Sequence, residues 1–101
     1  MSPSNKTRLF SQTFDARLLY RYKNIIDFRY NVNGASFLGF IIRKKYGNAV
    51  SRNRLKRVSR HLFLKIFMDN NVSIIIKPLC QNIAPVLLQK AFDDFKQTKL
   101  C

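Results

Sequence analysis

The side chains of this sequence with the clearest chemical character are its basic ones, which gather in the middle of the chain. No acidic residue stands between Asp27 and Asp69. The basic residues inside that stretch are Arg29, Arg43, Lys44, Lys45, Arg52, Arg54, Lys56, Arg57, Arg60 and Lys65. Such a cluster suits phosphate groups, because each cation that meets a nucleic-acid backbone releases condensed counterions. The pattern therefore indicates anion binding, with nucleic acid as the leading partner.

The acidic residues and the histidine do not suggest a hydrolytic site. The acids are all Asp, and His61 is the only histidine. Cutting a phosphodiester bond by protein alone would require carboxylates placed around metal ions, or a paired acid and base. Asp93 and Asp94 are adjacent, so on a helix their side chains diverge. We therefore expect no catalytic residue and no metal ligand in the protein itself.

The composition is typical of a small and strongly basic domain. The chain has 101 residues, 19 Lys and Arg against five acids, and a formal net charge of +14. That length fits a single RNA-binding domain over residues 1–101, with residues 1–7 expected to be disordered. No apolar stretch approaches the ~20 residues of a membrane-spanning helix, so we expect a cytoplasmic protein. Cys80 and Cys101 are too isolated for a disulfide framework or a zinc site.

The first half of the chain is predicted to supply a helix and two strands. Apolar residues at helical spacing predict a helix over residues 9–22. Strict alternation predicts a strand over residues 25–31 with Ile26, Phe28 and Tyr30 on one face. Asn33-Gly34 is a favoured tight-turn dipeptide, and a second apolar run follows at residues 36–42. We expect these two strands to form a hairpin.

The second half is predicted to supply two helices around one strand. Residues 50–68 form a helical pattern without Gly or Pro, and residues 72–77 are β-branched as in a central strand. Asn82 is placed to cap a last helix with Pro85 in its first turn. The order α-β-β-(β)-α-β-α predicts an α+β fold: a single-domain, two-layer α/β sandwich with a small, mostly antiparallel sheet.

The long middle helix is predicted to carry basic residues on one face. One sector of it holds Arg52, Asn53, Lys56, Arg57 and Arg60. The opposite sector, which would pack on the sheet, holds Leu55, Val58, Leu62 and Ile66. A solvated helix usually offsets its cations with Glu four residues away, and this chain has no Glu. Arg predominates on this face, which favours bidentate contacts with phosphate or guanine and therefore structured RNA.

The run from residue 44 to residue 60 resembles the signature of the bacterial ribonuclease P protein family. It reads KKYGNAVSRNRLKRVSR: a Lys-Lys pair, a Gly-Asn-Ala-Val crossover, then an arginine-rich segment. The resemblance implies the family's α/β sandwich, with an unusual left-handed strand-helix-strand crossover near Gly47. It also implies a function: the protein subunit of ribonuclease P, which assists a catalytic RNA in removing the 5′ leader from precursor tRNA.

The same resemblance implies roles for individual residues. Contact with the catalytic RNA and the nearby substrate is implied for Lys44, Lys45, Arg52, Asn53, Arg54, Lys56, Arg57 and Arg60. A cleft between the middle helix and the sheet would hold the single-stranded leader, with Lys45 reaching its backbone. Candidates for stacking on leader bases are Phe14, Phe28 and Tyr30, although packing in the core explains each of them equally well.

Further implications concern the cleft, the metal and the assembly. Ile41 and Arg43 stand where the family often has small hydroxyl residues, which would make the cleft more apolar at one point and more cationic at another. Magnesium would be held by the RNA subunit, with none bound tightly by the protein alone. The protein would be monomeric within the holoenzyme.

Three other functions are compatible with the same charge pattern. A ribosomal protein or general RNA chaperone would bind RNA without a processing role. A protein-only nuclease would cut RNA without an RNA subunit and would depend on Asp residues. A peripheral membrane protein would bind anionic lipid without distinguishing folded RNAs.

Overall fold

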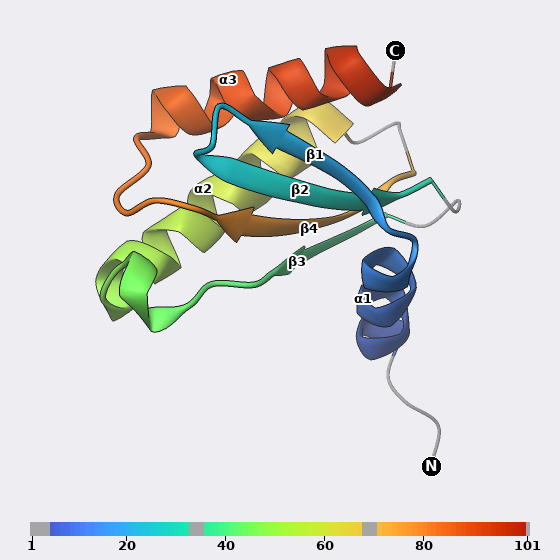
Figure 1. Cartoon of the computed structure of the whole chain (residues 1–101), viewed down its shortest axis with the longest axis horizontal. Helices are drawn as coiled ribbons and strands as arrows, with labels where there is room; N and C mark the ends of the chain where they lie inside the picture. Colours follow the sequence, from blue (N-terminus) through green and yellow to red (C-terminus); the bar gives the residue numbers. More distant parts are fainter. Residues whose placement is uncertain (1–4, 33–35, 68–70, 101) are drawn as a thin grey trace.

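The computed structural model describes residues 5–32, 36–67 and 71–100 of the chain (Figure 1). Its helices and strands are α1 (Asn5–Asp15), β1 (Leu18–Tyr22), β2 (Ile26–Asn31), β3 (Phe37–Phe40), α2 (Ala49–Phe67), β4 (Ser73–Pro78) and α3 (Pro85–Phe95). A short 3-10 helix, η1 (Lys44–Tyr46), precedes α2, and a π-helical turn, η2 (Lys96–Leu100), extends α3. Residues 5–7, which were expected to be disordered, are helical; residues 1–4 and the predicted Asn33-Gly34 turn lie outside the described residues.

The four strands form one mixed sheet in the order β1-β2-β4-β3. β1 and β4 both pair antiparallel with β2, and β3 pairs parallel with β4. The predicted hairpin between β2 and β3 is therefore wrong, because β4 lies between them. The residues of β4 explain its central place: Ile74, Ile75 and Ile76 are all 0% exposed, as expected for a strand covered on both faces.

The parallel pair β3 and β4 is joined by α2. This is the strand-helix-strand unit that carries the crossover implied by the resemblance. The strand order does not fix its hand, so the left-handed crossover stays a prediction.

The first predicted helix is too long, because its second half is a strand. α1 ends at Asp15, and Arg17 takes a left-handed conformation with φ 58° that redirects the chain into β1. Lys23 and Asn24 also have positive φ and make the tight turn between β1 and β2. This hairpin was missed because Tyr22 fits the helical pattern of the preceding residues as well as it fits a strand.

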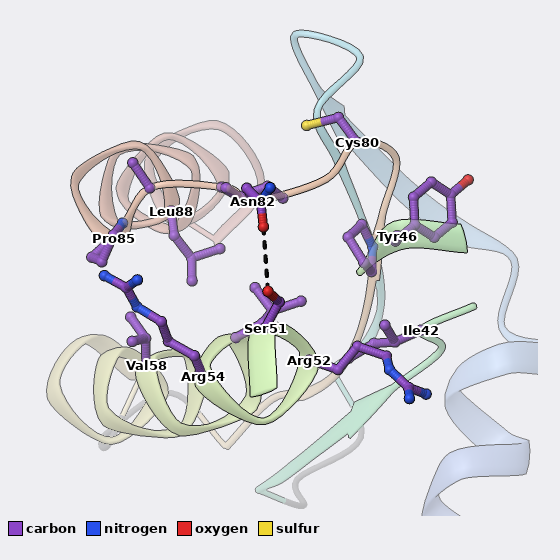
Figure 2. A pocket seen from close by; sticks show the side chains of 14 residues that line it. Ile42, Tyr46, Ser51, Arg52, Arg54, Val58, Cys80, Asn82, Pro85 and Leu88 are labelled. Atoms are coloured by element: carbon purple, nitrogen blue, oxygen red, sulfur yellow. Dashed lines mark hydrogen bonds between the residues drawn. The ribbon is translucent and has the colours of Figure 1, made fainter. Parts of the chain in front are cut away.

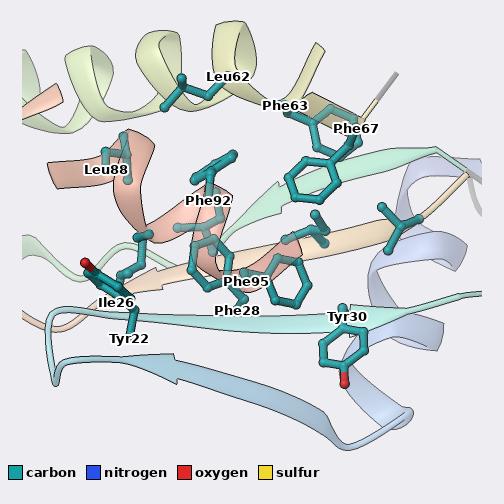
Figure 3. Close-up of a cluster of buried hydrophobic side chains, with 14 residues drawn as sticks. Tyr22, Ile26, Phe28, Tyr30, Leu62, Phe63, Phe67, Leu88, Phe92 and Phe95 are labelled. Carbon is teal, nitrogen blue, oxygen red and sulfur yellow. The ribbon is translucent and has the colours of Figure 1, made fainter. Parts of the chain in front are cut away.

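The core lies between the sheet and the helix pair α2 and α3, and it is rich in aromatic side chains (Figure 3). Phe28 of β2 stacks on Phe95 of α3, with ring centroids 4.8 Å apart and planes 2° from parallel. Phe92 contacts Phe28 edge-on at 5.3 Å, and Phe67 at the end of α2 lies 5.8 Å from Phe95. Burial of these rings packs α3 and the end of α2 against the sheet.

The opposite face of the sheet is partly covered by α1, which lies apart from α2 and α3 in Figure 1. Ile75 projects to this side, since its neighbours in β4 project into the core. The Phe10 ring of α1 rests on Gly39 of β3, where an added Cβ would lie only 2.9 Å from it. Gly39 therefore lets α1 approach the sheet closely.

Candidate nucleic-acid interface

The start of α2 is fixed by two residues of the signature segment. Gly47 has φ 145°, a conformation that residues with a side chain rarely adopt, and it redirects the chain after η1. Asn48 then caps the helix, because its Oδ1 accepts a hydrogen bond of 2.9 Å from the backbone N–H of Ser51. The cap sets where α2 begins.

The exposed face of α2 is cationic, as predicted. The centre of this face is rotated about the helix axis relative to the predicted basic sector. The basic and polar residues that α2 exposes are Asn53, Arg54, Arg57, Arg60, His61 and Lys65. Arg52 and Lys56, which were predicted to lie within the basic sector, are half-buried at its border. We call these eight residues the α2 cationic face.

The shift in that face has a packing cause. Phe63 and Phe67 are buried and occupy the side of the helix next to Lys56 and Arg60. The helix is therefore rotated about its axis so that these two side chains face the sheet. The predicted apolar residues pack as expected: Leu62 is buried, and Leu55 lies partly buried against the core. Two phenylalanines outside the predicted apolar stripe therefore decide the orientation.

No acidic side chain in the described part of the chain forms an ion pair with the α2 cationic face. Among the described residues, the ion pair found joins Arg21 to Asp27, far from α2 in sequence, with Nε to Oδ1 at 2.7 Å and Nη2 to Oδ2 at 3.0 Å. Arg52 donates a long hydrogen bond of 3.4 Å to the carbonyl of Asn48. The guanidinium carbon of Arg60 lies 5.7 Å from the centre of the Phe40 ring. The cations of α2 thus keep their charge available for phosphate.

The Arg21–Asp27 pair itself belongs to the sheet. Asp27 is buried, at 4% exposure, and is the cross-strand neighbour of Arg21. The hydrogen bond from Asp27, and then its negative charge, raise the pKa of the exposed Arg21 guanidinium above its ordinary value. Asp27 therefore stabilises the pairing of β1 with β2.

The two lysines of the signature lie in η1 and are both exposed. The Nζ of Lys45 lies 5.2 Å from the centre of the Tyr46 ring. The carbonyl of Lys45 accepts a hydrogen bond of 2.6 Å from Nε2 of Gln81, which ties η1 to the segment before α3. Lys44 and Lys45 therefore extend the cationic surface beyond the start of α2, on a turn that is held in place.

A cleft of about 310 Å³ lies at the N-terminal end of α2, between this helix, η1 and the segment that enters α3 (Figure 2). Its lining residues are Ile42, Tyr46, Ser51, Arg52, Arg54, Leu55, Val58, Pro78, Cys80, Asn82, Ile83, Ala84, Pro85 and Leu88. A cleft beside the middle helix is thus present. None of the three aromatic residues predicted for it lines it.

Two of those three aromatics are buried in the core, which corrects their assignment. Phe28 is 0% exposed and Tyr30 is 8% exposed, and both pack on Phe95. They face α3 because the alternation of β2 turns its aromatic side chains toward the helices. Neither is available for stacking on RNA bases in this conformation.

Phe14 is exposed, but it lies on the α1 side of the sheet. Its side chain is 42% exposed near the end of α1, and the guanidinium carbon of Arg29 sits 4.4 Å from its ring centre. An exposed aromatic ring beside a cation is an arrangement that suits single-stranded nucleic acid. Arg29 was not assigned to this site from the sequence. Its position on the α1 side of the sheet follows from the alternation of side chains along β2.

The described residues offer neither a metal site nor a membrane-spanning helix. No group of three His, Cys, Asp or Glu side chains that could hold a metal ion is present in the part of the chain that the structure describes. Within the same residues, no helix is both long enough and apolar enough to span a membrane.

Asn82 was predicted to cap α3, but it does not do so. The capping position is Ala84, and the Asn82 side chain instead accepts a hydrogen bond from Ser51.

Comparison with known proteins gives consistent results. The family model described as Ribonuclease P matches residues 5–98. The ribonuclease P protein component of Lactococcus lactis subsp. cremoris is 33% identical over 76 residues, which cover 71% of this chain and 65% of that protein. The matched stretch thus spans less than two thirds of this relative. The Finegoldia magna protein of the same name is 41% identical over 51 residues, covering 48% of this chain and 45% of the relative.

Solved structures share the fold at low sequence identity. An RNase P protein from Thermotoga maritima superimposes with a TM-score of 0.74 at 18% identity, covering 95% of this chain and 98% of that one. The Staphylococcus aureus RNase P protein gives a TM-score of 0.71 at 22% identity, covering 97% and 94%. The predicted α+β fold class is confirmed.

Proposed function

This chain belongs to the ribonuclease P protein family, and we propose that it binds the RNA subunit of ribonuclease P and assists removal of the 5′ leader from precursor tRNA. The observation that carries the proposal is the α2 cationic face, which is largely exposed and lacks acidic partners among the described residues. Phosphates of a folded RNA would supply the missing negative charge. The proposed partner is therefore structured RNA.

The proposed contact with the RNA subunit extends from η1 along α2. The residues we assign to it are Lys44, Lys45, Arg52, Asn53, Arg54, Lys56, Arg57 and Arg60. The exposure of Arg54, Arg57 and Arg60 on one helix face supports this assignment, because a rigid helix presents their guanidinium groups at fixed spacing to phosphates.

We assign the leader to the α1 side of the sheet, at Phe14 and Arg29, instead of to the cleft beside α2. Stacking on Phe14 would accept any base, and Arg29 would meet a neighbouring phosphate. Such tolerance suits an enzyme that processes many tRNA precursors. The exposure of Phe14 supports this choice over Phe28 and Tyr30, which are buried.

We assign hydrolysis and the magnesium ions to the RNA subunit. The protein would contribute cations around crowded phosphates and so raise the affinity for substrate and metal. The positions of the described acids support this division of roles: Asp27 is occupied by Arg21, and Asp93 and Asp94 lie on α3. We further propose that one copy of the protein acts in each holoenzyme.

Reconstitution tests this proposal. The protein is mixed with a bacterial ribonuclease P RNA and a leader-bearing tRNA precursor at low magnesium, and the mature 5′ end is quantified. We expect cleavage to be stimulated by the wild-type protein and by Lys90→Ala, a control on the exposed side of α3. Cleavage by the protein without RNA would identify a protein-only nuclease, and binding without stimulation would identify a general RNA chaperone.

The leader site is tested separately with Phe14→Ala. We expect this variant to bind a precursor with a leader about 5-fold to 150-fold more weakly, since one base stacked on an aromatic ring contributes ~1–3 kcal/mol. Affinity for tRNA without a leader should not change. Leu18→Ala is a matched control, because Leu18 is exposed to the same extent, 43% against 42% for Phe14. Equal effects of both variants would contradict the assignment.

A further inference from the structure

The function proposed above assigns no ligand to the interior of the cleft at the N-terminal end of α2, although two of its lining residues, Arg52 and Arg54, are among those assigned to the RNA subunit. It combines an apolar floor with a cationic rim. Leu55 and Val58 of α2 and Leu88 of α3 are among its apolar lining residues, and Arg52 and Arg54 leave α2 on different sides of the cleft (Figure 2). None of the described acidic residues lines it. A ligand that fits would have both an apolar part and a negative charge.

Two hydrogen bonds hold the walls of this cleft in place. Ser51 of α2 donates from Oγ to Oδ1 of Asn82 at 3.3 Å, the bond drawn in Figure 2. Gln81 donates from Nε2 to the carbonyl of Lys45 at 2.6 Å. The segment that enters α3 is thereby tied to both α2 and η1, so the cleft exists without a ligand and binding would not need to order it.

Asn82 is placed to contact a ligand. It takes a left-handed conformation with φ 54° and lines the cleft. Its amide oxygen accepts the bond from Ser51, which leaves the amide NH₂ group to donate toward an occupant. An amide donor beside apolar side chains can contact the edge of a nucleobase.

We infer that this cleft binds one unstacked nucleotide of RNA, with the base on the apolar floor and the phosphate on Arg52 or Arg54. The inference rests on RNA binding as proposed above and adds a site to it. The volume of about 310 Å³ is near the lower end of the range of roughly 300–1,000 Å³ that is typical of ligand pockets, which suits one nucleotide and excludes a duplex. The uncompensated arginines favour a phosphate-bearing occupant over a neutral one.

Asn82→Asp tests the site with little risk to the fold. The carboxylate has the shape of the amide, still accepts the bond from Ser51 and tolerates positive φ, but it brings a negative charge next to the phosphate. Asn71→Asp is a matched control: Asn71 is exposed, has φ 47° and does not line the cleft. Each protein is titrated with adenosine 5′-monophosphate and, separately, with inorganic phosphate, while amide chemical shifts are recorded.

We expect the nucleotide to shift the amide signals of Ser51 and Asn82, and inorganic phosphate to shift them much less. Asn82→Asp should weaken nucleotide binding about fivefold, the effect of one unit charge at ~4 Å in water, whereas Asn71→Asp should change it less than twofold. Equal responses to nucleotide and phosphate, or equal effects of the two variants, would overturn the inference. So would shifts produced by an acidic peptide and not by the nucleotide.

Cys80 reports whether RNA itself supplies the occupant. It is exposed and lines the cleft, so in a Cys101→Ser background its alkylation by iodoacetamide can be followed alone. We expect the ribonuclease P RNA to slow the reaction in the complex. If that RNA binds and leaves Cys80 fully reactive, the cleft inference fails while the proposed function stands. If that RNA does not bind, the proposed function fails, and the nucleotide titration still decides whether the cleft takes free nucleotides.

Discussion

Arg57 offers the most direct test of the α2 cationic face. Its side chain is exposed near the middle of α2, and the ion pair found among the described residues does not involve it. Arg57→Ala therefore removes one charge and breaks no salt bridge. Because Ala favours the helix and the site is on the surface, the free energy of unfolding should change by no more than about 0.5 kcal/mol.

The size of the binding effect follows from counterion release. Each phosphate contact contributes about 0.9 to the slope of log affinity against log salt concentration. A rise in salt from about 50 mM to about 200 mM then lowers the affinity about 3.5-fold for each phosphate contact. The ratio of wild-type to variant affinity should fall by about this factor over that range, because the variant has lost one salt-sensitive contact.

The assay is fluorescence anisotropy with labelled ribonuclease P RNA at four salt concentrations, with far-ultraviolet circular dichroism to confirm the fold. Lys90→Ala, a substitution of an exposed cation on α3, should leave the slope unchanged. Parallel salt dependences for the wild type and Arg57→Ala would refute the assignment of α2 to the RNA. An unfolded Arg57→Ala protein would refute the placement of this side chain on the surface.

Three substitutions test the structure behind the site. Phe28→Ala should lower the free energy of unfolding in urea by about 3–5 kcal/mol, because the ring is fully buried; a loss below about 1 kcal/mol would contradict its place in the core. Arg21→Ala should lower the urea midpoint in the same assay by leaving the buried Asp27 carboxylate without its two hydrogen bonds, and an unchanged midpoint would argue against the pair. Gly47→Ala should cost about 1–3 kcal/mol and lower Tm, since φ is 145° and the new Cβ would lie 3.0 Å from Cβ of Ser51; an unaltered Tm would speak against this backbone geometry.

The sequence predicted α2, β2 and α3 well because each is a long or strongly patterned segment whose apolar face meets one partner layer. It predicted β4 well because a short β-branched run is typical of a strand buried on both faces. It failed at Leu18, Leu19 and Tyr22, which fit both helical spacing after Phe14 and strand alternation. What decides between these is the pairing of β1 with β2, a contact between separate segments that local periodicity does not contain. The false hairpin has the same origin, since β4 reaches its place between β2 and β3 only after α2 has crossed the sheet.

The candidate site was predictable in its residue types and less so in its geometry. The basic residues of α2 and η1 followed from the signature segment, and their exposure is confirmed for Arg54, Arg57 and Arg60. Phe28 and Tyr30 illustrate the limit: alternation shows that they share a face, but not whether that face meets solvent or a helix. Only the position of α3 settles this, and it buries both.

The balance of energies along α2 indicates that this helix forms before any RNA binds. Like-charge pairs three or four residues apart, such as Arg54–Arg57 and Arg57–Arg60, each cost about 0.2–0.5 kcal/mol, so the repulsion along the helix amounts to about 1–2 kcal/mol. Burial of Leu62, Phe63 and Phe67 contributes about 1.5–3 kcal/mol each. The packed side therefore outweighs the repulsion on the exposed side. The protein can thus present its cations on a preformed helix, and RNA binding need not provide the energy to fold it.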